Sequence, residues 1–147
     1  MVNVDVTSEM VIERPLDEVA EYAADPSNAP AWYRNIEAVE WETDPPPRVG
    51  SRMKFVAHFL RRRLTYTYEL VELEPHARLV MRTAQGPFPM ETTYTWTAVS
   101  ERSTRMTLRN RGEPHGFSKV MAPFMSFAVR RANRKDLAAL KQLLEER

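Results

Sequence analysis

The chain has 147 residues, of which 43% are hydrophobic and 28% are charged, and its formal net charge is +1. This length suits one domain, residues 1–147, around one core, and the composition excludes a disordered chain. A charge so close to zero provides no general attraction to nucleic acid, so we expect no nucleic-acid partner.

The first third of the chain predicts a strand, two short helices and a second strand. Apolar and polar residues alternate over 4–12, which is typical of a half-buried strand. Helical spacing follows, and Asp25-Pro26 ends that helix. A second short helix over 28–34 and a strand over 36–43 come next in the prediction.

The middle of the chain, between 51 and 111, predicts five more strands in succession. In each of them apolar residues alternate with threonine, arginine, lysine or glutamate, so one sheet face should be solvated and the other apolar. Short turns separate these strands, and they fall at Arg61-Arg62, 74–77, 85–87 and 100–103.

Residues 117–146 predict one long amphipathic helix of about 45 Å, which can cross a whole sheet. Its predicted apolar face holds Val120, Phe124, Ala128, Ala132, Ala139 and Leu143, flanked by Met121, Met125, Leu140 and Leu144. Four basic residues lie on the far side: Arg130, Arg131, Arg134 and Lys135. Pro123 lies inside this pattern and should kink or restart the helix.

Four stretches and the terminal helix carry a resemblance that extends over nearly the whole chain. The stretches are Pro15-Leu16-Asp17-Glu18-Val19, Val49-Gly50-Ser51-Arg52, 67–75 and Gly86-Pro87-Phe88-Pro89-Met90. Together with the element order β-α-α-β-β-β-β-β-β-α, they resemble the START and polyketide-cyclase superfamily (SRPBCC), which includes birch-pollen-allergen-like proteins. The resemblance is to its polyketide cyclase/dehydrase-like branch.

The resemblance implies an α+β helix-grip fold, in which a curved antiparallel sheet of six or seven strands wraps around a long C-terminal helix. The superfamily holds aromatase/cyclases, dehydratases, lipid carriers, hormone receptors and co-chaperones. It has no shared catalytic motif, so the resemblance by itself fixes no activity and no catalytic residue.

The apolar face of the predicted sheet is unusually rich in aromatic residues and methionine. A curved sheet holds its helix away from its floor, so these side chains can line a cavity, although plain core packing is the alternative. We predict a ligand cavity lined by Trp32, Phe55, Phe59, Tyr66, Tyr68, Met81, Phe88, Tyr94, Trp96, Met106, Asn110, Met121, Phe124 and Met125.

The polar groups expected on that face are Tyr66, Tyr68, Tyr94 and Asn110. No histidine, aspartate or glutamate has the inward parity, which argues against strong acid–base chemistry. The basic cluster of the terminal helix is expected to be a solvated helix face, and acidic residues near it, such as Asp136, weigh against nucleic acid.

The residues around Pro123 have two interpretations, ordinary core contacts or a mobile gate. A proline break weakens the helix start, where Phe117, Met121, Phe124 and Met125 lie, and the loop residues Phe88 and Pro89 could form an opposing lip.

Other features exclude several classes of site. The chain has no cysteine, so it has no disulfide and no thiolate, and no carboxylate or histidine lies at metal-ligand spacing. It has no phosphate-binding loop, so we expect neither a metal nor a cofactor. The N-terminus lacks a signal peptide and no apolar stretch could span a membrane, so we expect a cytoplasmic protein.

Three functions remain open from the sequence. The first is binding of a small hydrophobic molecule (lipid, acyl or polyketide-like), as in a lipid-transport protein, between sheet and C-terminal helix. The second is an aromatase/cyclase or dehydratase-type enzyme that orients a poly-carbonyl chain away from water. The third is an interaction or co-chaperone module with a filled core, which a cavity below about 300 Å³ would favour. The sequence does not decide whether the chain is an enzyme, or whether it is a monomer or a homodimer.

Overall fold

The computed structural model describes residues 4–59, 61–113 and 122–147, and for Ala122 the backbone alone. In chain order the elements are β1 (Val4–Ile12), α1 (Leu16–Ala24), η1 (Pro26–Asn28), α2 (Ala29–Trp32), β2 (Ile36–Trp41), β3 (Arg52–Phe59), β4 (Arg62–Glu74), β5 (Arg78–Gln85), β6 (Met90–Ser100), β7 (Ser103–Gly112) and α3 (Ala122–Glu145).

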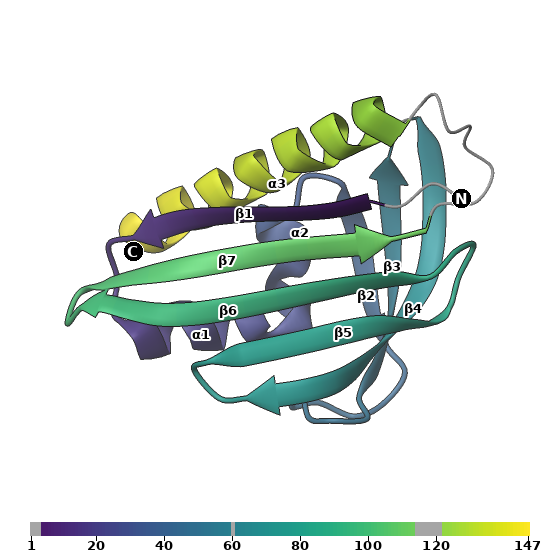
Figure 1. Ribbon diagram of the computed structural model, residues 1–147. Coiled ribbons are helices and arrows are strands. Elements are labelled where there is room, and N and C mark those ends of the chain that lie inside the picture. Colours follow the sequence, from purple (N-terminus) through teal and green to yellow (C-terminus); the bar gives the residue numbers. More distant parts are fainter. Residues whose placement is uncertain (1–3, 60, 114–121) are drawn as a thin grey trace.

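The seven strands form one antiparallel sheet in the order β1-β7-β6-β5-β4-β3-β2. The sheet curls so that β2, β3 and β4 turn away from the plane of β5, β6 and β7, and α3 lies along β1 on the concave side (Figure 1). The predicted α+β helix-grip fold, a curved antiparallel sheet around the C-terminal helix, is confirmed.

Strand alternation decides which side chains face the helix. In β3, Met53, Phe55 and Ala57 are buried, while Arg52 and His58 on the opposite parity are exposed. The same period of two holds in β1 and at the start of β7. Because both ladder partners keep this period, the concave face is mostly apolar, with a few polar side chains such as Thr92 and Thr104 among the buried ones.

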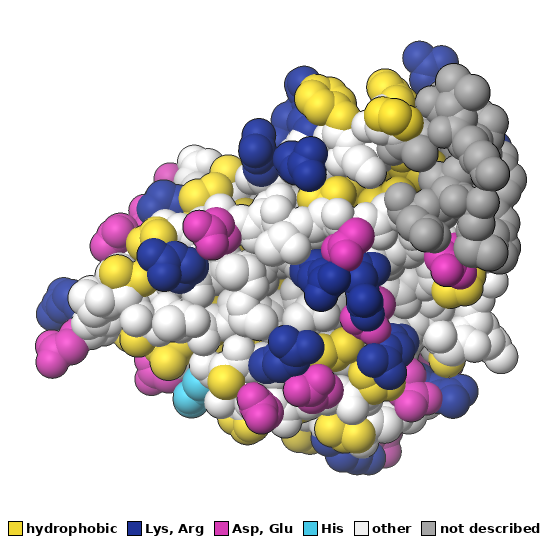
Figure 2. Space-filling model, in the orientation of Figure 1, with side chains coloured by type: hydrophobic (Ala, Val, Ile, Leu, Met, Phe, Trp, Pro, Cys, Tyr) yellow, Lys and Arg dark blue, Asp and Glu magenta, His cyan; other side chains and the backbone are white. Residues whose placement is uncertain are grey.

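The convex face carries paired charges instead. Glu91 of β6 accepts from Arg82 of β5 and from Arg111 of β7, each at 2.6 Å, and Arg109 pairs with Asp5 of β1 at 2.7 Å. Figure 2 shows basic and acidic side chains interspersed over β5, β6 and β7. These residues are solvated cross-strand pairs, which is the outward placement that the alternation predicts.

One end of the space under the sheet is filled. The C-terminal half of α3 buries Leu137, Leu140 and Leu144 completely. They belong to one core cluster with Trp32 and Met106, so no room remains there.

Arg14 fixes the C-terminal end of α3. Its guanidinium donates to three main-chain carbonyls, those of Leu144 at 2.7 Å, Glu145 at 2.9 Å and Arg147 at 2.7 Å. The last carbonyls of a helix have no partner within the helix, and a cation there also matches the negative end of the helix dipole. The helix end is therefore tied to the corner between β1 and α1.

The apolar face of α3 is displaced from the predicted face toward the residues expected to flank it, since Met125, Leu140 and Leu144 are buried. Phe124, expected on that face, is 51% exposed, whereas Met125 is buried together with Asn133 and Asp136. The predicted face was defined by the spacing of apolar residues alone. It therefore left out Asn133 and Asp136, which the fold turns inward. The described part of α3 begins at Ala122, so Pro123 lies at its start.

Candidate ligand cavity

A cavity of about 180 Å³ lies between the N-terminal half of α3 and the strands β3 to β7. Its walls are mostly apolar, and small side chains, among them Ala57, Val129 and Ala132, leave the space open. Nine of the predicted ligand-binding residues line it: Phe55, Phe59, Tyr66, Tyr68, Met81, Phe88, Tyr94, Asn110 and Met125.

Four predicted ligand-binding residues are placed elsewhere by the structure, and a fifth is not described. Trp32, Trp96 and Met106 are buried in the filled core rather than in the cavity wall. Phe124 points away from the core and is half exposed. Met121 lies outside the described residues, as does Phe117 of the predicted gate, so that gate stays a prediction.

Sequence reasoning missed several polar residues of the wall. Thr92 shares the inward parity of Tyr94, so the alternation of β6 could have identified it. Tyr33 and Asn35 come from the connection between α2 and β2, where no periodicity predicts a direction. The helix residues Asn133 and Asp136 do not belong to the apolar stripe, so apolar spacing does not identify them.

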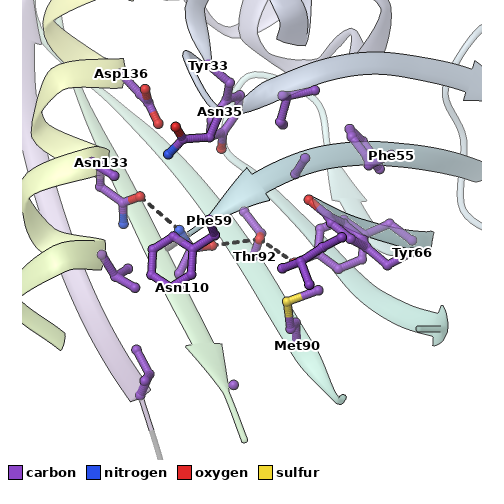
Figure 3. Close-up of a pocket in the computed structure, with 18 of the residues that line it drawn as sticks. Tyr33, Asn35, Phe55, Phe59, Tyr66, Met90, Thr92, Asn110, Asn133 and Asp136 are labelled. Atoms are coloured by element: carbon purple, nitrogen blue, oxygen red, sulfur yellow. Dashed lines mark hydrogen bonds between the residues drawn. The ribbon is translucent and has the colours of Figure 1, made fainter. Parts of the chain in front are cut away.

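A chain of hydrogen bonds crosses the wall from β4 to α3 (Figure 3). The Tyr68 hydroxyl lies 2.8 Å from Thr92 Oγ1, which donates to Asn110 Oδ1 at 2.7 Å. Asn110 Nδ2 in turn donates to Asn133 Oδ1 at 3.0 Å. The chain ends there, because Asn133 Nδ2 is buried and has no partner among the described residues.

Two tyrosines form a second polar pair beside this chain. The hydroxyls of Tyr33 and Tyr94 are 2.6 Å apart, and the Trp32 ring packs against both aromatic rings. Burial raises the pKa of both phenols well above the usual value, and it raises the pKa of Tyr68 to about 12. All three therefore stay neutral and act as hydrogen-bonding groups at physiological pH.

Asp136 is the acidic group of the cavity, and it corrects the prediction that none would face inward. The residue is 3% exposed and lines the cavity, where its Oδ1 accepts the main-chain N–H of Arg34 at 3.1 Å. Burial raises the pKa of its carboxyl to about 6, although the Arg34 contact acts in the opposite direction.

The described residues lack two further kinds of feature, a cluster of metal ligands and a membrane-spanning helix. Within 4–59, 61–113 and 122–147, no group of three or more histidine, aspartate or glutamate residues is arranged to hold a metal ion. None of the helices in that part of the chain combines the length and apolarity that crossing a bilayer requires.

Residues 3–145 match the family model described as polyketide cyclase / dehydrase and lipid transport. The chain belongs to this family. The match confirms the superfamily that the sequence resembles, and it includes every residue of the cavity. A comparison with curated proteins finds no match.

Solved structures share this fold at low sequence identity. A protein from Thermus thermophilus is 18% identical over 97% of each chain, with a TM-score of 0.83. The Zhui aromatase/cyclase from Streptomyces sp. R1128 is 16% identical over 99% of this chain and 95% of its own, with a TM-score of 0.82. A START superfamily protein from Mycobacterium smegmatis is 12% identical over 97% of each chain, with a TM-score of 0.83. These likenesses show a common fold.

Proposed function

We propose that this protein binds a small hydrophobic molecule in the cavity between α3 and the sheet. The observation that carries the proposal is an apolar cavity whose hydrogen-bonded polar wall ends in an unpartnered buried amide. Apolar walls with a few directed polar groups are typical of ligand sites. The polar wall would orient the molecule, and the aromatic floor would bury its apolar part.

The cavity volume limits what the site accepts. A cavity of about 150 Å³ with apolar walls is large enough to bind benzene. At about 180 Å³ the space fits a molecule with one ring or a short acyl chain. A polycyclic ligand would need the cavity to widen.

The same volume is below about 300 Å³, the size under which an interaction module with a filled core becomes the favoured alternative. The wall argues against that alternative. A core that only supports an outer contact surface gains nothing from Asp136 and Asn133, whose burial is unfavourable unless a partner compensates for it.

A toluene titration observed through the methionine methyl NMR signals tests the proposal. Met81, Met90 and Met125 line the cavity, whereas Met53 and Met106 are buried outside it. We expect saturable shifts in the first three signals and little change in the other two. Uniform shifts, or none, would contradict the cavity assignment.

A matched pair of variants completes this test. Ala132→Leu puts three more carbons into the cavity and should abolish the toluene response. Ala138→Leu makes the same change on the exposed side of α3 and should leave the response intact. If both variants bind toluene as the native protein does, the molecule occupies another place.

An enzyme of the dehydratase or aromatase/cyclase type is the second candidate, and Asp136 is the observation that favours it. A carboxyl with a pKa of about 6 can remove a proton at neutral pH and return it. In a β-hydroxyketone, it would take the proton next to the carbonyl, and the hydroxyl would leave as water to give the enone. The fold shared with the Zhui aromatase/cyclase is compatible with this chemistry.

The enzyme hypothesis is tested with 4-hydroxybutan-2-one, whose dehydration to the conjugated enone is visible in the ultraviolet. We expect a rate that rises with pH around 6 and falls about 100-fold in Asp136→Asn. Toluene binding should persist in that variant. If the native protein binds the ketone but does not accelerate its dehydration, the enzyme hypothesis fails and only the proposed binding function remains.

A further inference from the structure

We infer that the side-chain amide of Asn133 donates a hydrogen bond to a carbonyl oxygen of the ligand. The cavity would then select neutral carbonyl compounds over hydrocarbons of the same shape. This inference rests on the proposed binding function and names its ligand class. It follows from the direction of the hydrogen-bond chain, from the burial of its last member and from the acidic group beside it.

The direction of the chain determines what its end can offer. Thr92 has one hydroxyl hydrogen and gives it to Asn110 Oδ1, so Tyr68 must donate to Thr92. Asn110 then uses Nδ2 to donate to Asn133 Oδ1. The oxygen of Asn133 is therefore engaged, and its amide hydrogens are what remain.

Those hydrogens have no acceptor among the described residues. Asn133 is 3% exposed, its Nδ2 is shielded from solvent, and the residue lines the cavity (Figure 3). A buried donor without a partner is unfavourable and rare in folded proteins. An acceptor supplied by a ligand would remove this cost, whereas a hydrocarbon would leave it in place.

Asp136 narrows the class of acceptor. It lies three residues after Asn133, on the neighbouring position of the same helix face, and both residues line the cavity. A carboxylate ligand would bring a second negative charge to this wall when Asp136 is ionised. A neutral carbonyl, as in a ketone, aldehyde or amide, provides the acceptor without that repulsion.

The probes for the test are acetophenone and α-methylstyrene, two planar molecules that differ by C=O against C=CH₂. NMR titration of the full chain gives both dissociation constants, corrected for the partition of each probe from water into cyclohexane. We expect the native protein to favour acetophenone about tenfold after this correction. The Asn133 side-chain amide signals should shift with acetophenone and not with α-methylstyrene.

Two isosteric variants separate Asn133 from general polarity. Asn133→Asp keeps an oxygen for Asn110 and replaces the free donor by an acceptor, so the preference for acetophenone should disappear. Asn35→Asp makes the same change at another cavity residue outside the chain, and the preference should remain. Loss of the preference in both variants would overturn the role of Asn133.

The two affinities of the native protein, for acetophenone and for α-methylstyrene, test the inference even if the variants do not fold. Equal corrected affinity for the two probes would overturn it while leaving hydrophobic binding in place. If neither probe binds, the proposed function fails and the inference fails with it.

Discussion

The two halves of α3 face the same curved sheet and meet it in different ways. The C-terminal half buries Leu137 and Leu140 completely and leaves no space beneath them. The part of α3 that precedes Leu137 presents Ala132, Asn133 and Asp136 to a cavity. Side-chain size and polarity along one helix therefore divide the interior into an end that holds the fold together and an end that is free to hold a ligand.

Leu140→Ala should have the largest effect, because it removes apolar volume at the filled end. Truncating a fully buried leucine costs about 2–5 kcal/mol of unfolding free energy. Ala132→Leu, which adds the same atoms at the hollow end, should cost little or even stabilise. Urea unfolding measures both, and equal destabilisation by the two variants would remove the distinction between the ends.

Asp136→Asn should stabilise the protein at neutral pH. The unfolded carboxyl loses its proton near 3.8 and the folded one near 6, so the unfolded state binds fewer protons between these values. Native stability therefore falls as pH rises through that window and stays lower above it. The variant escapes this loss, which is about 3 kcal/mol above pH 7, and its stability approaches that of the native protein below about pH 3.

Unfolding free energies at several pH values check this prediction. Asn keeps an oxygen for the N–H of Arg34, so the comparison isolates the charge. Equal stability of the two proteins at every pH would show that the carboxyl is not held in a desolvated site.

Thr92→Val should have an intermediate effect, because it breaks the hydrogen-bond chain in the middle. Valine has the same shape, but Tyr68 and Asn110 each lose a buried partner. We expect a loss of about 1–2 kcal/mol by chemical denaturation. Thr97→Val on the exposed side of the same strand is the control and should be nearly neutral.

Arg109→Gln should have the smallest effect. Its ion pair with Asp5 lies on the solvated convex face, where exposed pairs contribute little. We expect almost no change in thermal midpoint, and the small remaining difference should vanish at high salt. A large drop would mean that the convex face, and not the filled end, carries an important part of the stability.

The sequence predicts the strands and their facing well, because alternation with a period of two is a strong signal over seven strands. Nine cavity residues follow from that alternation, from their position beside a turn or from the apolar spacing of the helix. Asn133 and Asp136 could not be found by apolar periodicity, since a cavity wall on a helix is partly polar. The cavity volume also has no sequence signal, because it depends on how far the helix and the strands that line it stay apart.

The hydrogen bonds from Arg14 to the last carbonyls of α3 hold one end of the helix in place. With 24 residues, the described helix forms a lever about 36 Å long. A rotation of about 5° at the held end would carry the far end about 3 Å while the leucines next to the held end hardly move. If a larger ligand pushes α3 away from the sheet, rotation about the end held by Arg14 widens the cavity most. The packed core near the C-terminal end of the helix moves least.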